Sequence, residues 1–85
     1  MSWTLRIREK TKKHLQRLPQ KEQKRIRETL FELTKNPYSG DISKLENEDD
    51  LWRRRIGAYR IKFQIRSKEM VIYVYEIERR TSKTY

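Results

Sequence analysis

The segment LWRRRIGAYRIKFQI, residues 51–65, has the pattern of a β-hairpin. Its two halves are rich in residues that favour strands, and Gly57-Ala58 separates them. A glycine at the first position of a two-residue loop favours a type II′ turn, because glycine adopts positive φ without a steric penalty. Such a turn places Ile56 opposite Tyr59 and thereby sets the pairing of every residue farther along both strands.

In this register the two faces of the hairpin differ in chemistry, because side chains alternate along a strand. One face carries six apolar or aromatic side chains, which are Trp52, Ile56, Tyr59, Ile61, Phe63 and Ile65. The other face carries four cations and no acid, which are Arg53, Arg55, Arg60 and Lys62. Like charges directly opposite each other destabilise a strand pair, so we expect this face to bind something negative. Arg54 falls on the apolar face, where we expect it either to lie at a sheet edge or to reach solvent with its guanidinium, rather than to take part in catalysis.

The composition supports a small domain with an anionic partner. The 85 residues predict a single domain, 1–85, with one small core, and the absence of cysteine excludes disulfides and thiolate metal sites. The net charge of +10 favours nucleic acid as the ligand, ahead of an anionic membrane or an acidic protein. No run is long and apolar enough for a signal peptide or a membrane span, so we expect a cytoplasmic protein.

The rest of the chain supplies two helices and two further strands. Alternating residues predict a strand over Ser2–Arg8, and helical spacing of apolar residues predicts helices over Glu9–Leu18 and Gln20–Lys35. The segment Met70–Ile77 is the strongest strand by composition, with apolar residues on both faces, so we expect it near the sheet centre. The acidic stretch Asp41–Asp50 is expected to be a loop.

The resulting order is β-α-α-β-β-β, which predicts an α+β fold. We expect a small, antiparallel-rich sheet of four strands, with a helical hairpin packed on one face and the arginine-bearing face open. In the last strand, simple alternation puts Tyr73 and Tyr75 on one face with Ile77.

The sequence excludes several kinds of catalytic site. His14 is the only histidine, so a mechanism with two histidines is excluded, and a transition-metal site is not expected without cysteine. Gly40 and Gly57 are the only glycines, so there is no glycine-rich phosphate loop. We therefore expect no metal and no cofactor.

The order KL…LWRRRIGAYRIKFQI…VIYVYEIERR…Y resembles the RelE/ParE toxin superfamily of type II toxin–antitoxin systems, over essentially the whole chain. The resemblance to its RelE branch implies a ribosome-dependent, metal-independent endoribonuclease that cuts mRNA in the ribosomal A site by 2′-OH attack. It also implies a cognate antitoxin, contact with operator DNA only through the antitoxin complex, and no membrane partner. The ParE branch, which inhibits gyrase without nuclease chemistry, and an inactive nucleic-acid-binding relative are the alternatives.

The resemblance carries five catalytic positions onto this chain, which are Arg53, Arg55, Arg60, Arg79 and Tyr85. Fixed guanidinium groups stabilise the extra negative charge of a phosphorane transition state. The branch usually has lysine at the first two positions, and an arginine cannot readily act as a base. Tyr85 is then either the general base or a group that stacks on a nucleotide base. We also expect Lys44 and Lys62 to contact RNA phosphates.

Overall fold

The structure is a computed structural model of the chain, and it describes residues 3–45 and 50–79. The elements are β1 (Thr4–Ile7), α1 (Glu9–Gln16), α2 (Gln20–Lys35), β2 (Ile42–Lys44), β3 (Leu51–Ile56), β4 (Tyr59–Arg66) and β5 (Val71–Arg79). The α+β class is therefore confirmed, with one strand more than the four expected. Neither described helix is long and apolar enough to cross a membrane.

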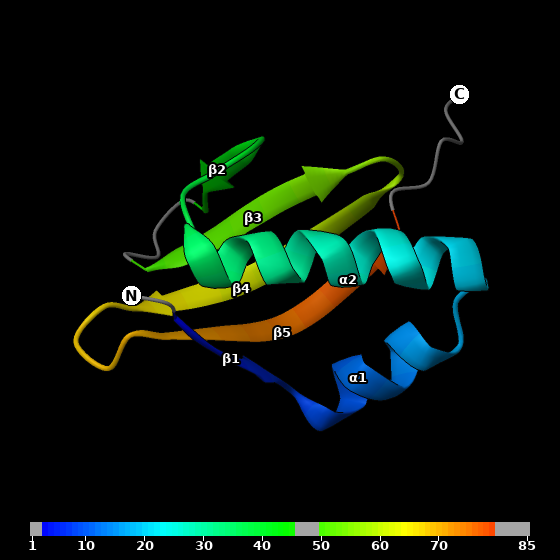
Figure 1. Cartoon of the computed structure of the whole chain (residues 1–85), viewed down its shortest axis with the longest axis horizontal. Coiled ribbons are helices and arrows are strands. Elements are labelled where there is room, and N and C mark those ends of the chain that lie inside the picture. The colour runs from blue at the N-terminus through cyan, green and yellow to red at the C-terminus, as the bar shows by residue number, and fades with distance from the viewer. Residues whose placement is uncertain (1–2, 46–49, 80–85) are drawn as a thin grey trace.

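The strands form one mixed sheet in the order β1-β5-β4-β3-β2 (Figure 1). Only the β1–β5 pair is parallel among the described strands, and the others are antiparallel. The interior place of β5, hydrogen-bonded on both sides, confirms the expectation drawn from its apolar composition. The prediction that Asp41–Asp50 is only a loop was wrong, because β2 pairs with β3, with Ser43 opposite Arg53. Three residues are too few to show an alternating pattern in the sequence.

The hairpin register predicted from the turn is confirmed. Ile56 pairs with Tyr59 and Arg55 pairs with Arg60, and the pairing continues without a shift to Leu51. Gly57 has φ +59°, and glycine adopts that conformation without the penalty a Cβ would bring. Positive φ at the first loop residue alone is the signature of a type II′ turn, so the turn type is confirmed as well.

Both helices pack on the apolar face of the sheet, and Figure 1 shows α2 lying across that face. Buried residues of α1, α2 and the sheet meet in one core, which contains Leu15, Ile26, Leu30, Leu33, Tyr59, Ile61, Phe63, Ile65, Ile72, Val74 and Ile77. Pro19 precedes the first turn of α2, where its missing N–H costs nothing, and Asn36-Pro37 ends the helix. The helices therefore cover one face and leave the other to the hairpin's cations.

A register shift in β5 changes which of its side chains face the core. Lys62 pairs with Glu76 but Phe63 pairs with Val74, so Tyr75 is an extra residue on β5. Val74 and Ile77 are both buried on the helix side although three residues separate them. The expectation that Tyr73 and Ile77 share a face by simple alternation was wrong for this reason, because Tyr73 pairs with Gln64 and Ile77 pairs with the core residue Ile61. The bulge also sends Glu76 and Glu78 to the open face.

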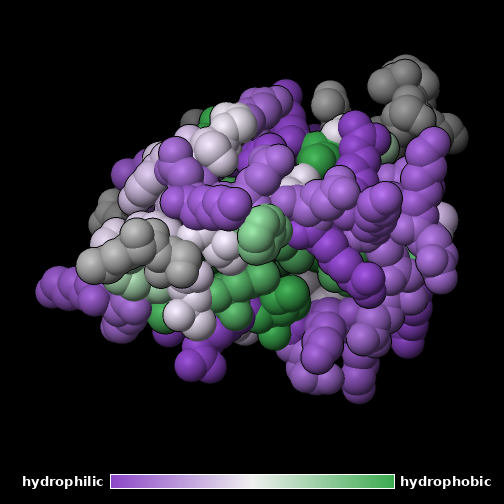
Figure 2. Space-filling view, in the orientation of Figure 1, coloured by the Kyte–Doolittle hydropathy of each residue, from purple (hydrophilic) through white to green (hydrophobic). Residues whose placement is uncertain are grey.

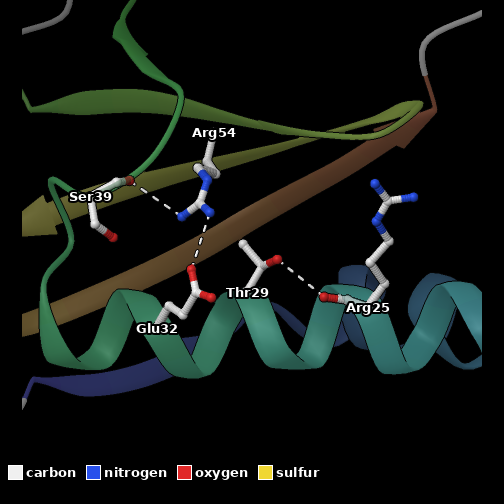
Figure 3. Close-up of polar contacts among 5 residues, drawn as sticks. All are labelled: Arg25, Thr29, Glu32, Ser39 and Arg54. Atoms are coloured by element: carbon white, nitrogen blue, oxygen red, sulfur yellow. Dashed lines mark hydrogen bonds and ion pairs between the residues drawn. The ribbon is translucent and has the colours of Figure 1, made fainter.

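Arg54 lies inside the protein, between β3 and α2 (Figure 3). The residue is only 9% exposed and β3 is not an edge strand, so both alternatives, a sheet edge and a guanidinium that reaches solvent, were wrong. Its Nη1 donates a hydrogen bond to the Ser39 carbonyl at 3.3 Å, and its Nη2 pairs with Glu32 Oε1 at 3.2 Å. The added strand β2 covers the edge of β3, and Arg54 thereby ties β3 to α2 and to the loop before β2.

Candidate functional site

The sheet face opposite the helices brings four of the predicted residues together. Arg53 and Arg55 lie on β3, and Arg60 and Lys62 lie directly across from them on β4, with Arg55 opposite Arg60 and Arg53 opposite Lys62. We call these four side chains the cationic face. Arg55 is exposed and the other three are half-buried. Their positions follow from strand alternation and from the turn at Gly57, so they lie on two paired strands rather than on loops.

Two carboxylates from β5 lie beside the cationic face. Glu78 Oε1 lies 3.7 Å from Arg60 Nη1 and 3.5 Å from Lys62 Nζ, and Glu76 Oε1 lies 3.3 Å from Lys62 Nζ. The hairpin itself contributes no acid to this face, as expected, and the two acids come from β5 in the assembled sheet. The physical reason is the β5 bulge, which pairs Glu78 with Arg60 and Glu76 with Lys62. The two acids pair with Arg60 and Lys62, so the net positive charge of this face comes from Arg53 and Arg55.

Two arginines of the cationic face have a buried donor without an acceptor. The Nε atoms of Arg53 and Arg60 are buried and make no hydrogen bond in the described part of the chain. Arg53 Nη2 donates to Ser43 Oγ at 3.3 Å, which holds the guanidinium against β2. An unpaired buried donor costs about 1–3 kcal/mol, and such groups in native proteins are found where water, an ion or a ligand completes the bonding.

Arg79, Lys44 and Tyr85 do not join the cationic face in the described structure. Arg79 ends β5 opposite Tyr59, a core residue, so it belongs to the helix side of the sheet. Lys44 pairs with Trp52 and is likewise on the helix side by alternation. Tyr85 lies outside the described residues. The register therefore places Arg79 and Lys44 on the helix side of the sheet, apart from the four side chains of the cationic face.

Arg79 lines a cleft of about 710 Å³ between α1 and the second half of β5. Most of the lining side chains are basic, and they include Arg8, Lys10, Lys13, His14 and Arg17. The sequence alone did not show that Arg79 opens onto these side chains, because their juxtaposition depends on how α1 docks on β5. The docking includes a hydrogen bond of 2.7 Å from Thr11 Oγ1 to the Tyr75 carbonyl at the bulge.

A second, apolar groove lies between α1, α2 and β1, and sequence reasoning missed it. Its lining is mainly apolar, with Leu5, Ile7, Leu15, Leu30 and Phe31, and its volume is about 270 Å³. Figure 2 shows a green apolar patch below α2, surrounded by hydrophilic residues in purple. Phe31 is 61% exposed, and helical spacing in the sequence could have placed it off the stripe formed by Ile26, Leu30 and Leu33.

The chemistry that the cationic face offers is phosphate binding and stabilisation of negative charge. Arginine presents a planar fork that can hold two phosphate oxygens, and the face provides three arginines and one lysine. No group of three metal-ligating side chains that could hold a metal ion is found among residues 3–45 and 50–79. The arrangement is suited to a reaction in which charge builds up on phosphate oxygens.

Comparison with known proteins gives concordant matches. The sequence matches the family of ParE toxins of type II toxin–antitoxin systems (parDE) over residues 2–83. It is 29% identical over 83 residues to the toxin candidate RelE1 of Methanocaldococcus jannaschii, covering 94% of this chain and 92% of that protein.

Solved structures agree with the sequence matches. A chain of the archaeal RelE–RelB complex of Pyrococcus horikoshii superposes with a TM-score of 0.84 at 30% identity, covering 98% of this chain and 100% of that one. A chain of the RelBE2 toxin–antitoxin complex of Mycobacterium tuberculosis superposes with a TM-score of 0.83 at 21% identity, covering 94% of this chain and 100% of its own. At the lower identity the likeness concerns the fold alone.

Proposed function

Since the chain belongs to the ParE toxin family of the RelE/ParE superfamily, we propose that it is a RelE-like endoribonuclease toxin. It cuts mRNA in the ribosomal A site, inhibits translation in the cytoplasm, and is neutralised by a cognate antitoxin. The observation that carries the proposal is the cationic face, where Arg53, Arg55 and Arg60 stand together on paired strands away from both helices.

In the proposed reaction the 2′-OH of one nucleotide attacks the adjacent phosphate. The phosphorane transition state carries more negative charge than the bound RNA, so fixed guanidinium groups stabilise it more than the ground state. Arg60 and Arg55 contact the reacting phosphate, while Arg53 and Lys62 hold the flanking backbone. Arg79 approaches from the rim of the sheet, since it neighbours Tyr59, the residue next to Arg60.

The ribosome supplies what this small face lacks. Four side chains on one sheet face bind phosphates without holding the ribose and the leaving oxygen in line. Holding the reacting atoms in line lowers the activation barrier of such reactions by a large amount. We therefore expect cutting to require mRNA held in the A site.

The test is primer extension on a reporter mRNA, with and without programmed ribosomes. Wild-type protein is expected to give discrete cuts in the A-site codon only with ribosomes. Arg60→Ala is expected to lower the cutting rate by about 10²–10³-fold, the range found when one transition-state donor is removed. Lys24→Ala is the matched control, since it removes one exposed cation from α2, away from the cationic face.

A ParE-like toxin without nuclease activity is the second candidate, because the matching family is described by its ParE members. If the purified protein inhibits DNA gyrase and leaves ribosome-bound mRNA intact, it is a gyrase-inhibiting toxin and not a nuclease. Wild-type cutting by Arg60→Ala would instead refute the role given to the cationic face.

The cognate antitoxin is the partner that the relatives support, since several were crystallised with RelB. We propose that an acidic and apolar antitoxin segment masks the cationic face or displaces the C-terminal tail. Contact with operator DNA then arises only through the antitoxin complex. Protection of Arg53 and Arg60 from arginine-specific chemical modification in the complex is the expected result, and unchanged modification would contradict direct masking.

A further inference from the structure

The proposed cleavage needs a group that removes the proton from the attacking 2′-OH. Arginine stays protonated in proteins, so none of the three arginines on the cationic face can do this. The open face nevertheless holds proton acceptors that the hairpin alone does not reveal. These are the carboxylates of Glu76 and Glu78, brought there by the β5 bulge.

Of the two carboxylates, Glu78 is the one beside Arg60. It pairs with Arg60 across the β4–β5 ladder, and its Oε1 lies 3.7 Å from Arg60 Nη1 and 3.5 Å from Lys62 Nζ. Both ion pairs involve Oε1. The side chain is 34% exposed, so a ligand on the face can reach it.

Glu76 occupies a different place on the same face. Its ion pair is with Lys62 at 3.3 Å, and it stands opposite Lys62 in the ladder rather than opposite Arg60. Within the described part of the chain, only Glu78 shares an ion pair with an arginine of the cationic face. The two acids are thus alike in charge and strand but differ in their distance from the proposed phosphate site.

We propose that Glu78 is the general base of the cleavage reaction, an inference that rests on the proposed nuclease function. A guanidinium holds a phosphate at about 2.7–2.9 Å, and the Glu78 carboxylate lies beside the same guanidinium. The ribose attached to that phosphate therefore comes within hydrogen-bond reach of Glu78. Arg60 and Lys62 together offset the repulsion between the carboxylate and the incoming phosphate.

The step balances without a metal or a cofactor. Glu78 takes the 2′-OH proton as the O2′–P bond forms, and the P–O5′ bond breaks with its electron pair on the 5′ oxygen. Solvent water protonates that oxygen, and the products are a 2′,3′-cyclic phosphate and a 5′-hydroxyl. Protonated Glu78 then returns its proton to solvent.

The experiment measures single-turnover cutting of mRNA in programmed ribosomes over a range of protein concentrations. The variants are Glu78→Gln, which keeps the shape and removes the base, Glu78→Asp, and the matched control Glu76→Gln. We expect Glu78→Gln to lower the saturating rate by about 10²–10⁴-fold, the usual contribution of a general base. Its half-saturating concentration stays the same or falls, because a negative charge beside the phosphate is lost. Glu78→Asp recovers part of the rate, and Glu76→Gln cuts at close to the wild-type rate.

Other outcomes overturn the inference in distinguishable ways. A wild-type saturating rate for Glu78→Gln with a lower half-saturating concentration would show that Glu78 only screens Arg60. An equal loss of rate in Glu76→Gln would show that cutting depends on both acids beside Lys62 and not on Glu78 as the base. If the wild type and Glu78→Gln both cut at the full rate and Arg60→Ala does not cut, the inference about Glu78 fails while the proposed nuclease function stands. If wild type leaves the mRNA intact, both fall together. Circular dichroism melts of each variant show that the comparison is between folded proteins.

Discussion

Replacing Gly40 by alanine tests the packing around the buried Arg54. Gly40 has φ +80°, and a Cβ there would overlap Cζ of Arg54 and lie 2.5 Å from its Nε. The guanidinium cannot simply swing away, because Glu32 and the Ser39 carbonyl hold it in an enclosed position (Figure 3). The substitution is therefore expected to act both on the backbone and on this contact.

The magnitude follows from two contributions. Alanine at a left-handed φ costs about 1 kcal/mol. Displacing the guanidinium adds about 1–2 kcal/mol, less than for a fully buried pair because Glu32 is 58% exposed and solvent screens it. The free energy of unfolding should fall by about 2–3 kcal/mol, and Tm by roughly 10–20 °C for a domain of this size. Urea denaturation followed by circular dichroism measures the change.

Gly57→Ala is the matched control, because Gly57 also has positive φ, at +59°. Its Cβ would lie 2.8 Å from Nη1 of Arg25, but Arg25 is exposed on α2 and its guanidinium can move away. Only the backbone cost of about 1 kcal/mol should remain. In an Arg54→Ala background, Gly40→Ala should likewise cost about 1 kcal/mol. Equal costs of Gly40→Ala in both backgrounds would refute the contact with Arg54 as the cause.

Two further predictions concern the cationic face and the docking of α1. Arg55→Ala should reduce the slope of log K against log salt for single-stranded RNA by about 0.7, because one exposed phosphate contact is lost; an unchanged slope would remove Arg55 from the interface. Thr11→Val should lower the free energy of unfolding by about 0.5–1.5 kcal/mol in urea denaturation, because it deletes the 2.7 Å hydrogen bond to the Tyr75 carbonyl. The control Thr34→Val loses only a bond within its own helix, and an equal loss there would contradict the docking role of Thr11.

The hairpin and the helices could be predicted because their signals are local. Gly57 sets the turn, the turn sets the pairing of Arg55 with Arg60, and alternation assigns each residue to a face. The spacing of apolar residues in α2 likewise predicted its buried stripe. Each of these features depends on residues within one or two turns or pleats of one another, so a single sequence contains the required information.

The remaining features depend on contacts between segments far apart in the chain. β2 is visible only through its pairing with β3, and the bulge at Tyr75 only through the register between β4 and β5. That register brings Glu78 to Arg60 while keeping both Val74 and Ile77 in the core. The sequence by itself therefore determined which residues form the cationic face. Only the tertiary structure decided which acids share that face and which arginine is buried, because strand register and edge coverage arise when distant segments meet.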